Sequence, residues 1–194
     1  MACNMHLSEL TTFRVGGPAD YLGIAESVSD VRSLFLFAKK EKIPFFVLGG
    51  GSNVVFRDEG YRGLIIKNEI RGIEYLHKDA GIVHVIAGAG ESWDLFVGAT
   101  VSRGLYGLEN LSSIPGTVGA APVQNIGAYG SEVKDNIVWV EAYDTEADII
   151  VRFPNSACVF EYRNSLFKTK GGRHLIVVRV MFELSRTPCL NTGY

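Results

Sequence analysis

The 194-residue sequence lacks most of the features that mark a specialised class of protein. Its three cysteines are far apart and form no CxxC pair, which argues against a disulfide framework or a zinc site and is typical of reduced thiols. The four histidines are equally scattered, so we expect no metal centre. No apolar run reaches the ~18 residues that a membrane helix needs, and the first residues lack the basic-then-apolar order of a signal peptide. We therefore expect a cytoplasmic protein that does not associate with a membrane.

An excess of charge of one sign is also missing, because 19 Lys and Arg residues face 21 Asp and Glu residues. The net charge of −2 gives no electrostatic reason to expect a nucleic acid as partner. The carboxylate pair, Ser-His-Asp set or Cys-His pair of a hydrolase has no obvious counterpart either. The chain is 47% hydrophobic and long enough to bury an ordinary core, as one domain or two small ones.

Short strands and two amphipathic segments indicate an α+β fold. Residues 1–68 are predicted to form a β-α-β unit, whose helix starts with a cap at Ser29 or Asp30 and ends before Pro44. The strand that follows this helix runs into a glycine turn.

Residues 69–187 are predicted to form a second α+β unit. It contains a helix capped near Ser92 and a hairpin that turns near Asp144 and Thr145. The final strand, LIVVRVMFEL, alternates enough to have one solvated face. No linker composition separates the two units, so we expect them to pack together around something.

Glycine is abundant, with 22 residues, and two clusters of it stand out. The first is LGGGSN at 48–53, which follows a predicted buried strand. Consecutive N–H groups in such a turn can form a nest for phosphate oxygens, and Ser52 and Asn53 add donors. The motif is not a Walker A loop, because no GK[ST] follows, and Val54 replaces the last glycine of GxGxxG. A tight turn between two strands is the alternative.

The second cluster is SSIPGTVGAAPVQNIGAYG at 112–130. Its small residues at 119–121 would let the backbone pass close to a flat or charged ligand, and Gln124 and Asn125 offer donors and acceptors to a ring edge. A long surface loop is the alternative, but this loop is apolar as well as bare, which favours contact with a large ligand. A dinucleotide would need two such cradles, one for its pyrophosphate and one for its rings.

A third candidate is CVFEYRNSLFK at 158–168, which places four functional side chains between apolar residues. Arg163 is permanently charged and can donate twice, so it could stabilise a developing oxyanion. The alternative, and the more common role, is an arginine that joins two strands through surface ion pairs.

These segments, together with TTFRVGGPADYL, YRGLIIKN and AGAGESW, occur in the order found in one enzyme family. From about Leu10 to its end, the chain resembles the UDP-N-acetylenolpyruvoylglucosamine reductases (UDP-N-acetylmuramate dehydrogenases), flavoproteins of peptidoglycan synthesis and hence of cell-wall biogenesis. The resemblance implies an FAD-binding fold of the vanillyl-alcohol-oxidase (PCMH) type, in which two α+β subdomains hold FAD between them.

The resemblance also assigns residues to roles. Arg163 matches the catalytic arginine that stabilises the enolate, and it is expected with Tyr194 to contact the substrate. The cofactor-binding residues that the resemblance implies are Val47, Leu48, Gly49, Gly50, Gly51, Ser52, Asn53, Pro115, Gly116, Gly119, Ala120, Val123, Asn125, Gly127, Tyr129, Tyr162 and Val177.

The implied reaction uses NADPH as hydride donor to the flavin, which then reduces the enolpyruvyl ether of a UDP-sugar to UDP-N-acetylmuramate. In the family, the serine that protonates the substrate and a supporting glutamate belong to a third domain. We expect residues 188–194 to begin the linker to that domain, which a separately encoded C-terminal half could supply. The alternative is an FAD-binding fragment without turnover of its own.

Overall fold

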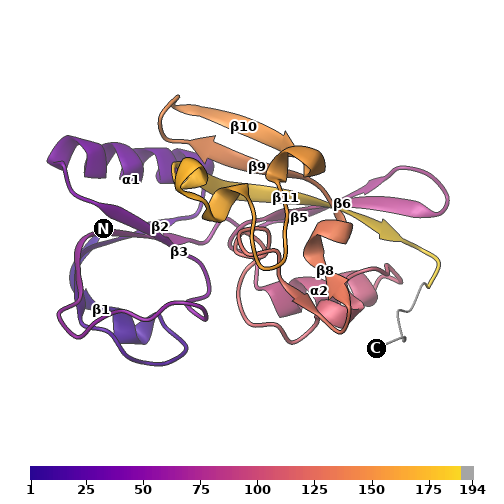
Figure 1. Ribbon diagram of the computed structural model, residues 1–194, viewed down its shortest axis with the longest axis horizontal. Coiled ribbons are helices and arrows are strands. Elements are labelled where there is room, and N and C mark those ends of the chain that lie inside the picture. Colours follow the sequence, from indigo (N-terminus) through magenta and orange to yellow (C-terminus); the bar gives the residue numbers. More distant parts are fainter. Residues whose placement is uncertain (189–194) are drawn as a thin grey trace.

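Two β-sheets dominate the computed structural model, which describes residues 1–188 (Figure 1). The first sheet has four strands in the order β1-β2-β4-β3, with β2, β4 and β3 parallel and β1 antiparallel to β2. Its strands are β1 (Ala2–His6), β2 (Pro18–Ala25), β3 (Phe45–Leu48) and β4 (Tyr61–Asn68). The predicted β-α-β unit is present, and β1 is a strand that the sequence pattern did not predict.

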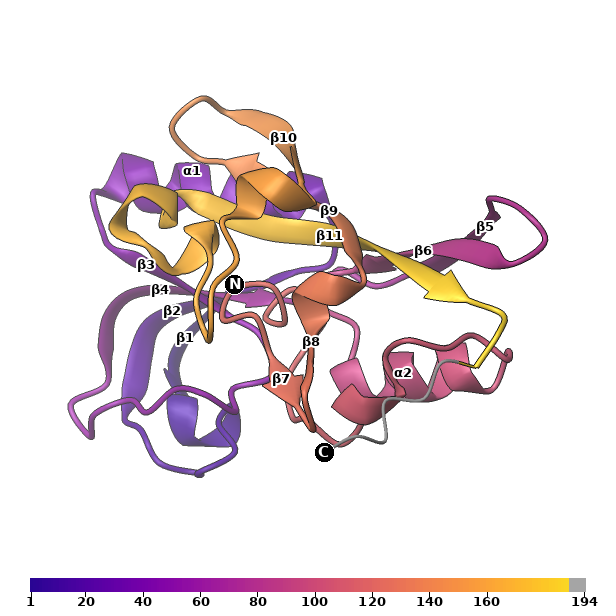
Figure 2. The same cartoon turned by 45° about the vertical axis from the view of Figure 1, so that its right-hand side comes forward.

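The second sheet has five antiparallel strands in the order β10-β9-β11-β6-β5. Its strands are β5 (Ile73–His77), β6 (Ile82–Gly88), β9 (Ile137–Asp144), β10 (Ile149–Pro154) and β11 (Leu175–Ser185). The β9–β10 hairpin turns at Asp144, as predicted. A short hairpin, β7 (Gly127–Ala128) and β8 (Ser131–Glu132), lies below this sheet (Figure 2).

Helix α1 (Val28–Glu41) joins the two sheets, because its apolar face packs on both. Its residues Val31 and Ala38 share one buried cluster with Leu64 of β4 and with Tyr143 and Ile176 of the second sheet. Figure 1 shows α1 lying along the first sheet and beside β9 and β10. The two sheets are therefore parts of one packed structure.

The start of α1 differs from the prediction. The N-cap is Ser27, whose hydroxyl accepts a hydrogen bond from the N–H of Asp30 at 3.2 Å, so neither Ser29 nor Asp30 is the cap. Asp30 lies three residues further on, where its carboxylate reaches back to the N–H of Glu26 at 3.1 Å, an arrangement that suits a residue inside the first turn. The helix ends at Glu41, before Pro44, as predicted.

The predicted solvated face of β11 is present only along the second half of the strand, where Arg179 is exposed and Glu183 is partly exposed. Ile176, Val177 and Val178 are all buried, and so are Val180 and Phe182. Both faces are covered only along the first half of the strand, which lies between helix α1 and the larger core. Ile176 and Val178 face the α1 cluster, whereas Val177, Val180 and Phe182 belong to the larger core under helix α2.

Helix α2 (Trp93–Val101) covers the other face of the second sheet and defines the larger core. Trp93, Phe96 and Phe182 form an aromatic group with ring centroids 5.1–6.0 Å apart. The same core takes up Val118, Ala121 and Ile126 from the second glycine cluster, so that loop is anchored by its apolar side chains. Within residues 1–188 no helix is both long and apolar enough to cross a membrane.

Candidate functional site

The first two glycine-rich segments lie directly against each other. A Cβ atom at Gly50 would stand 3.0 Å from the Cα atom of Gly116, so the Gly116 backbone occupies space that a side chain at position 50 would need. Ser52 donates its hydroxyl to the carbonyl of Pro115 at 3.2 Å. Asn53 donates its amide to the side-chain oxygen of Gln124 at 2.8 Å. Two clusters more than 60 residues apart in sequence thus form one surface.

Glycine is required at position 51 of this turn. Gly51 has a φ of +70°, and a Cβ atom there would lie 1.9 Å from the carbonyl oxygen of Leu10. The carbonyl of Gly51 in turn accepts a hydrogen bond from the N–H of Thr12 at 3.0 Å. The turn is therefore pressed against the segment that precedes β2.

The backbone N–H groups of residues 50–53 make this turn suitable for an anion. None of these four groups donates a hydrogen bond to an acceptor within residues 1–188. Gly50 is exposed, whereas Gly51 is buried beneath it. Successive N–H donors on a tight turn form the kind of concavity that binds phosphate oxygens.

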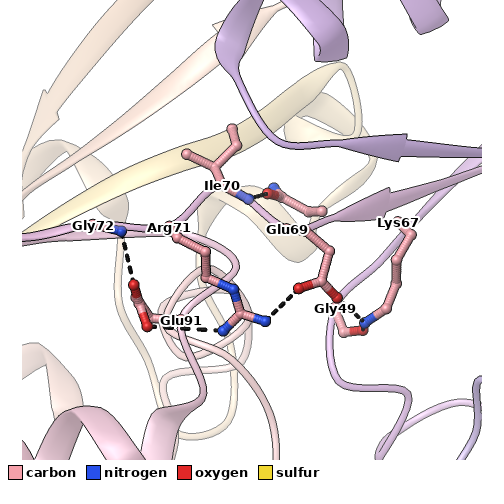
Figure 3. Close-up of polar contacts among 8 residues, drawn as sticks. Gly49, Lys67, Glu69, Ile70, Arg71, Gly72 and Glu91 are labelled. Atoms are coloured by element: carbon pink, nitrogen blue, oxygen red, sulfur yellow. Dashed lines mark hydrogen bonds and ion pairs between the residues drawn. The ribbon is translucent and has the colours of Figure 1, made fainter.

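Lys67, near the end of β4, holds the carbonyl side of the same turn (Figure 3). Its Nζ atom donates to the carbonyl oxygen of Gly49 at 2.5 Å and forms an ion pair with Glu69 at 3.0 Å. Partial burial raises the pKa of Glu69, but Lys67 and Arg71 together outweigh that effect and hold the pKa below its usual value. Glu69 is therefore charged at neutral pH and keeps Lys67 in place.

The charged chain continues from Glu69 toward α2 (Figure 3). Arg71 pairs with Glu69 and, at 3.8 Å, with Glu91, whose carboxylate accepts the N–H of Gly72 at 2.7 Å. This network spans the connection between the two sheets and ends just before α2. It ties the glycine turn of the first sheet to the second sheet.

The third candidate segment forms a tight turn. Glu161 and Asn164 exchange backbone hydrogen bonds of 3.0 and 3.1 Å, which leaves Tyr162 and Arg163 at the tip. Arg163 has a φ of +54°, a conformation that non-glycine residues seldom adopt. The turn therefore presents two exposed side chains from a constrained backbone.

Three side chains attach this turn to the second glycine cluster. Asn125 donates its amide to the carbonyl of Glu161 at 3.0 Å, and Ser165 donates its hydroxyl to the carbonyl of Val123 at 2.7 Å. Arg163 donates to the carbonyl of Gly127 at 2.6 Å. Figure 2 shows the loop between β10 and β11 reaching down toward β7 and β8. Loop 112–130 is thus the centre of the site, in contact with both other segments.

Arg163 makes no ion pair with a carboxylate of residues 1–188, which argues against the surface ion-pair role considered from sequence. Its guanidinium lies 5.7 Å from the ring centroid of Tyr162. One of its five donors is used by the carbonyl of Gly127, so the others are available to an oxyanion.

Tyr129 stands at the tip of the β7–β8 hairpin. Tyr129 and Gly130 both have positive φ angles, +50° and +72°, as the two central residues of a type I′ turn do. The Tyr129 side chain is 64% exposed, and that of Tyr162 is 81% exposed. Two aromatic rings therefore lie at the surface, one near the end of the central loop and one on the turn attached to it.

Several predicted cofactor-binding residues face the protein interior instead of solvent. Leu48 and Val177 pack their side chains into the core, as does the partly buried Val47. The side chain of Asn125 is fully buried and accepts the N–H of Lys134 at 3.1 Å in addition to its donated bond. These residues can shape a ligand site, but their side chains do not line its surface.

The close approach expected at residues 119–121 involves the protein itself. A Cβ atom at Gly119 would lie 2.5 Å from the Cβ of Ala89, and the Gly119 N–H donates to the Ala89 carbonyl at 2.8 Å. Ala120 is exposed, whereas Ala121 is buried in the core. Some of the small residues in this loop are therefore explained by close packing within the protein.

Sequence reasoning missed Lys67, Glu69, Arg71 and Glu91. The available signal was the lysine at the end of the apolar run LIIK, because a charged side chain on a buried strand is unfavourable unless it has a partner. Tyr194, predicted to contact substrate, lies outside the described residues, as does most of the predicted linker.

Among residues 1–188 no group of three or more His, Cys, Asp and Glu side chains could hold a metal ion.

The two described cysteines are free thiols. Cys3 is exposed on β1, and Cys158 is buried. Burial raises the pKa of the Cys158 thiol to about 12, and its Sγ contacts the carbonyl of Pro154 at 3.5 Å. Cys158 is therefore a packing residue and not a nucleophile.

Comparison with known proteins shows which family shares this sequence and fold. The family model described as an FAD binding domain matches residues 19–152. The UDP-N-acetylenolpyruvoylglucosamine reductase of Pseudomonas fluorescens is 42% identical over 191 residues, which cover 98% of this chain and 56% of that protein. The protein of the same name from Thermobifida fusca is 40% identical over 186 residues, covering 96% and 52%. The chain thus spans about half the length of the curated relatives it matches.

Solved structures agree with these relatives. UDP-N-acetylenolpyruvylglucosamine reductase (MurB) from Thermus caldophilus superposes with a TM-score of 0.75 at 30% identity, covering 95% of this chain and 62% of that one. Cholesterol oxidase from B. sterolicum superposes with a TM-score of 0.62 at 15% identity, covering 84% and 34%. The second likeness shows the fold alone, whereas the family model and the first structure confirm the predicted α+β class of FAD-binding fold.

Proposed function

This chain belongs to the family of FAD binding domains, and we propose from that premise that its three convergent segments form the FAD site. The observation that carries the proposal is the turn at 48–53, whose four N–H groups at 50–53 donate to no acceptor in the described chain. A pyrophosphate carries the oxygens that such donors bind. The residues present therefore fit this part of FAD.

The rest of the cofactor would lie along the central loop. That loop has only small residues at Gly116 and Ala120, carries Tyr129 near its end and is bordered by Tyr162, and both tyrosine rings are exposed. Small residues beside aromatic side chains suit a flat ring system. The site would then lie between the glycine turn of the first sheet and loops of the second, as expected for FAD held between two subdomains.

The reaction that we propose for the whole protein is reduction of UDP-N-acetylglucosamine enolpyruvate to UDP-N-acetylmuramate, with NADPH as electron source. When bound, FAD would supply the two-electron redox chemistry. Arg163 would hold the negative charge that develops on the substrate carboxylate, because its exposed guanidinium keeps donors free. We propose a cytoplasmic location for this reaction, as a step of peptidoglycan synthesis.

A second candidate function is FAD binding without turnover by this chain alone. The observation in its favour is coverage, because the chain matches only 56% of the P. fluorescens relative and 52% of the T. fusca relative. In this case a separately encoded half would complete the substrate site.

FAD titration of the purified chain, followed by flavin absorbance and fluorescence, tests the cofactor site. We expect saturable binding that the Gly50→Ala substitution weakens about tenfold or more, because the new Cβ would push the turn away from Gly116. Gly98→Ala is the matched control, since nothing lies within 4 Å of the Cβ that it adds. A chain that takes up no FAD, or a Gly50→Ala variant that binds as the parent does, would contradict the assignment.

Substrate-dependent NADPH oxidation separates the two candidate functions. Turnover by the chain alone supports the reductase, whereas FAD binding with turnover only after addition of a relative's C-terminal half supports the second candidate. In the active form, Arg163→Lys is expected to lower kcat by about 10²-fold, because lysine loses the bidentate geometry. Retained FAD affinity in this variant would show that the loss is chemical.

A further inference from the structure

A cavity of about 300 Å³ lies apart from the three-segment site, between the β5–β6 hairpin and the residues that follow α2. This is the region of Figure 1 where β5 and β6 extend beyond the helix. Its lining residues are Tyr75, His77, Val83, Arg103, Leu105 and Arg186. None of them belongs to the segments assigned to FAD, so the cavity needs its own explanation.

Two arginines in this cavity have no carboxylate partner. Neither Arg103 nor Arg186 forms an ion pair with an acidic side chain within residues 1–188. The Arg103 guanidinium stacks 4.5 Å above the ring centroid of Tyr75 and donates to the Ala99 carbonyl at 3.3 Å. Both guanidinium groups are always charged, so the cavity carries two positive charges that no carboxylate of residues 1–188 compensates.

The hydroxyl of Tyr75 is buried and has no hydrogen-bond partner in the described part of the chain. Buried polar groups in folded proteins are almost always hydrogen-bonded, so this hydroxyl marks a position where an acceptor is missing. The ring that carries it lies beneath the guanidinium of Arg103, and Tyr75 is one of the residues that line the cavity.

His77 contributes a further donor. Arg186 donates to its Nδ1 atom at 3.1 Å, and because arginine has no acceptor, that nitrogen must carry the lone pair. The proton of the neutral ring is then on Nε2. The cavity thus combines two guanidinium groups, a phenolic hydroxyl and an imidazole N–H, while Val83 and Leu105 provide an apolar wall.

We propose that this cavity binds a phosphoryl group, either as free phosphate or as the phosphate of a small organic ester. Arginine forks match the oxygen geometry of phosphate, and a dianion would compensate both charges while accepting a bond from Tyr75. The apolar wall and a volume of about 300 Å³ leave room for a small organic part. The proposal is independent of FAD binding at the glycine turn.

Titration with inorganic phosphate at constant ionic strength, followed by amide chemical shifts in the presence of excess FAD, tests the proposal. We expect saturable shifts around residues 75–77, 103 and 186. Arg103→Gln should weaken phosphate binding about tenfold or more, which is the loss of one charge-assisted contact. Arg173→Gln removes the same charge from an exposed position outside the cavity and should leave the affinity unchanged.

Tyr75→Phe provides a second variant that does not depend on charge. We expect it to raise the melting temperature of the phosphate-free protein, because it removes an unpaired buried hydroxyl, yet to weaken phosphate binding severalfold. Glycerol phosphate binding more tightly than phosphate would identify an ester as the ligand class, and equal affinity would identify free phosphate. Shifts confined to residues 50–53, or equal phosphate affinity in Arg103→Gln and Arg173→Gln, would overturn the proposal.

Discussion

At the scale of single residues, buried polar side chains set the shape of the candidate site. Asn125 is fully buried, has a φ of +43°, and uses both ends of its amide on the backbones of Glu161 and Lys134. Asparagine tolerates a positive φ better than most residues. Asn125 therefore suits both the backbone conformation and the two hydrogen bonds required at this position. The exposed Arg163 depends on this scaffold for its position.

Asn125→Ala should therefore destabilise the protein by about 2–4 kcal/mol, because it removes both hydrogen bonds of a buried side chain and places alanine at a positive φ. Urea unfolding followed by tryptophan fluorescence measures this loss. Asn164→Ala, which removes only a 3.2 Å bond to the exposed Glu161 carboxylate, is the control and should change stability by less than about 0.5 kcal/mol. Equal losses in the two variants would contradict the scaffold role.

At the scale of elements, the glycine turn takes its orientation from the strand beside it. Lys67 of β4 holds the Gly49 carbonyl on one side of the turn, so the N–H of Gly50 in the same planar peptide points the other way. The network through Glu69 and Arg71 keeps that lysine in place. The partly buried Lys67 thus helps to fix the conformation of the glycine turn.

Lys67→Met should weaken FAD binding about fivefold while leaving the fold intact, because methionine fills the same space but donates no hydrogen bond. Lys170→Met makes the same charge change at an exposed position and controls for long-range attraction of the phosphates. An FAD affinity that falls equally in both variants would mean that charge, and not orientation of the turn, is responsible. FAD titration measures the affinity of each variant, and circular dichroism shows whether its fold is intact.

Gly98 in helix α2 allows a separate test of how helix propensity affects stability. Gly98 is exposed in the middle of this helix, and a Cβ atom there would meet nothing within 4 Å. Gly98→Ala should therefore stabilise the protein by about 0.5–1 kcal/mol, because alanine loses less backbone entropy in a helix. Thermal unfolding of the variant and the parent measures the gain, and a lowered melting temperature would show that the space is needed.

The elements themselves were largely predictable, because their signals are local. The β9–β10 hairpin, both helices and the strand before the glycine turn follow from periodicity and turn residues. The cap at Ser27 was missed because three polar residues compete at the start of α1, and only the extended backbone of Ser27 decides among them. The burial of both faces at the start of β11 could not be predicted, since it depends on the packing of α1 on Ile176 and Val178.

The candidate site was predictable as a set of segments but not as an arrangement. Composition marked 48–53 and 112–130, whereas the packing of Gly119 on Ala89 is a tertiary contact that composition cannot distinguish from contact with a ligand. Lys67 was missed for the same reason, because its partner is a backbone carbonyl 18 positions away.

At the scale of the whole molecule, α1 connects the two sheets by charge as well as by packing. Arg32 makes two hydrogen bonds of 2.6 Å to the carboxylate of Asp148 in the β9–β10 turn, and Tyr143 donates its hydroxyl to the same carboxylate at 2.8 Å. Burial and the neighbouring carboxylate raise the pKa of Tyr143 to about 12, so it remains a donor at neutral pH. The helix is thereby fixed to the second sheet at its exposed edge.

This contact predicts a loss of stability in acid. The hydrogen bonds from Arg32 and Tyr143 lower the pKa of Asp148 from 3.8 to about 2. Because the folded-state pKa is the lower one, the stabilisation is present above the ordinary value and is lost as the pH falls through about 2. Urea unfolding across this range should show a slope that Asp148→Asn reduces.

Asp58→Asn is the control for that measurement, because Asp58 lies on an exposed loop. We expect this variant to keep the slope of the parent. Identical slopes in all three proteins would show that Asp148 contributes nothing to the acid response.

During synthesis, the first sheet is complete once residue 68 has left the ribosome, whereas the second sheet waits for its middle strand. That strand, β11, is the last to emerge, and without residues 175–185 the strands β9 and β6 have no neighbour in common. Until then the α1 face that packs on Ile176 and Val178 stays open to solvent. A nascent chain stalled before residue 175 would therefore present a folded first sheet beside an unfinished second one, which is the species that a chaperone would meet.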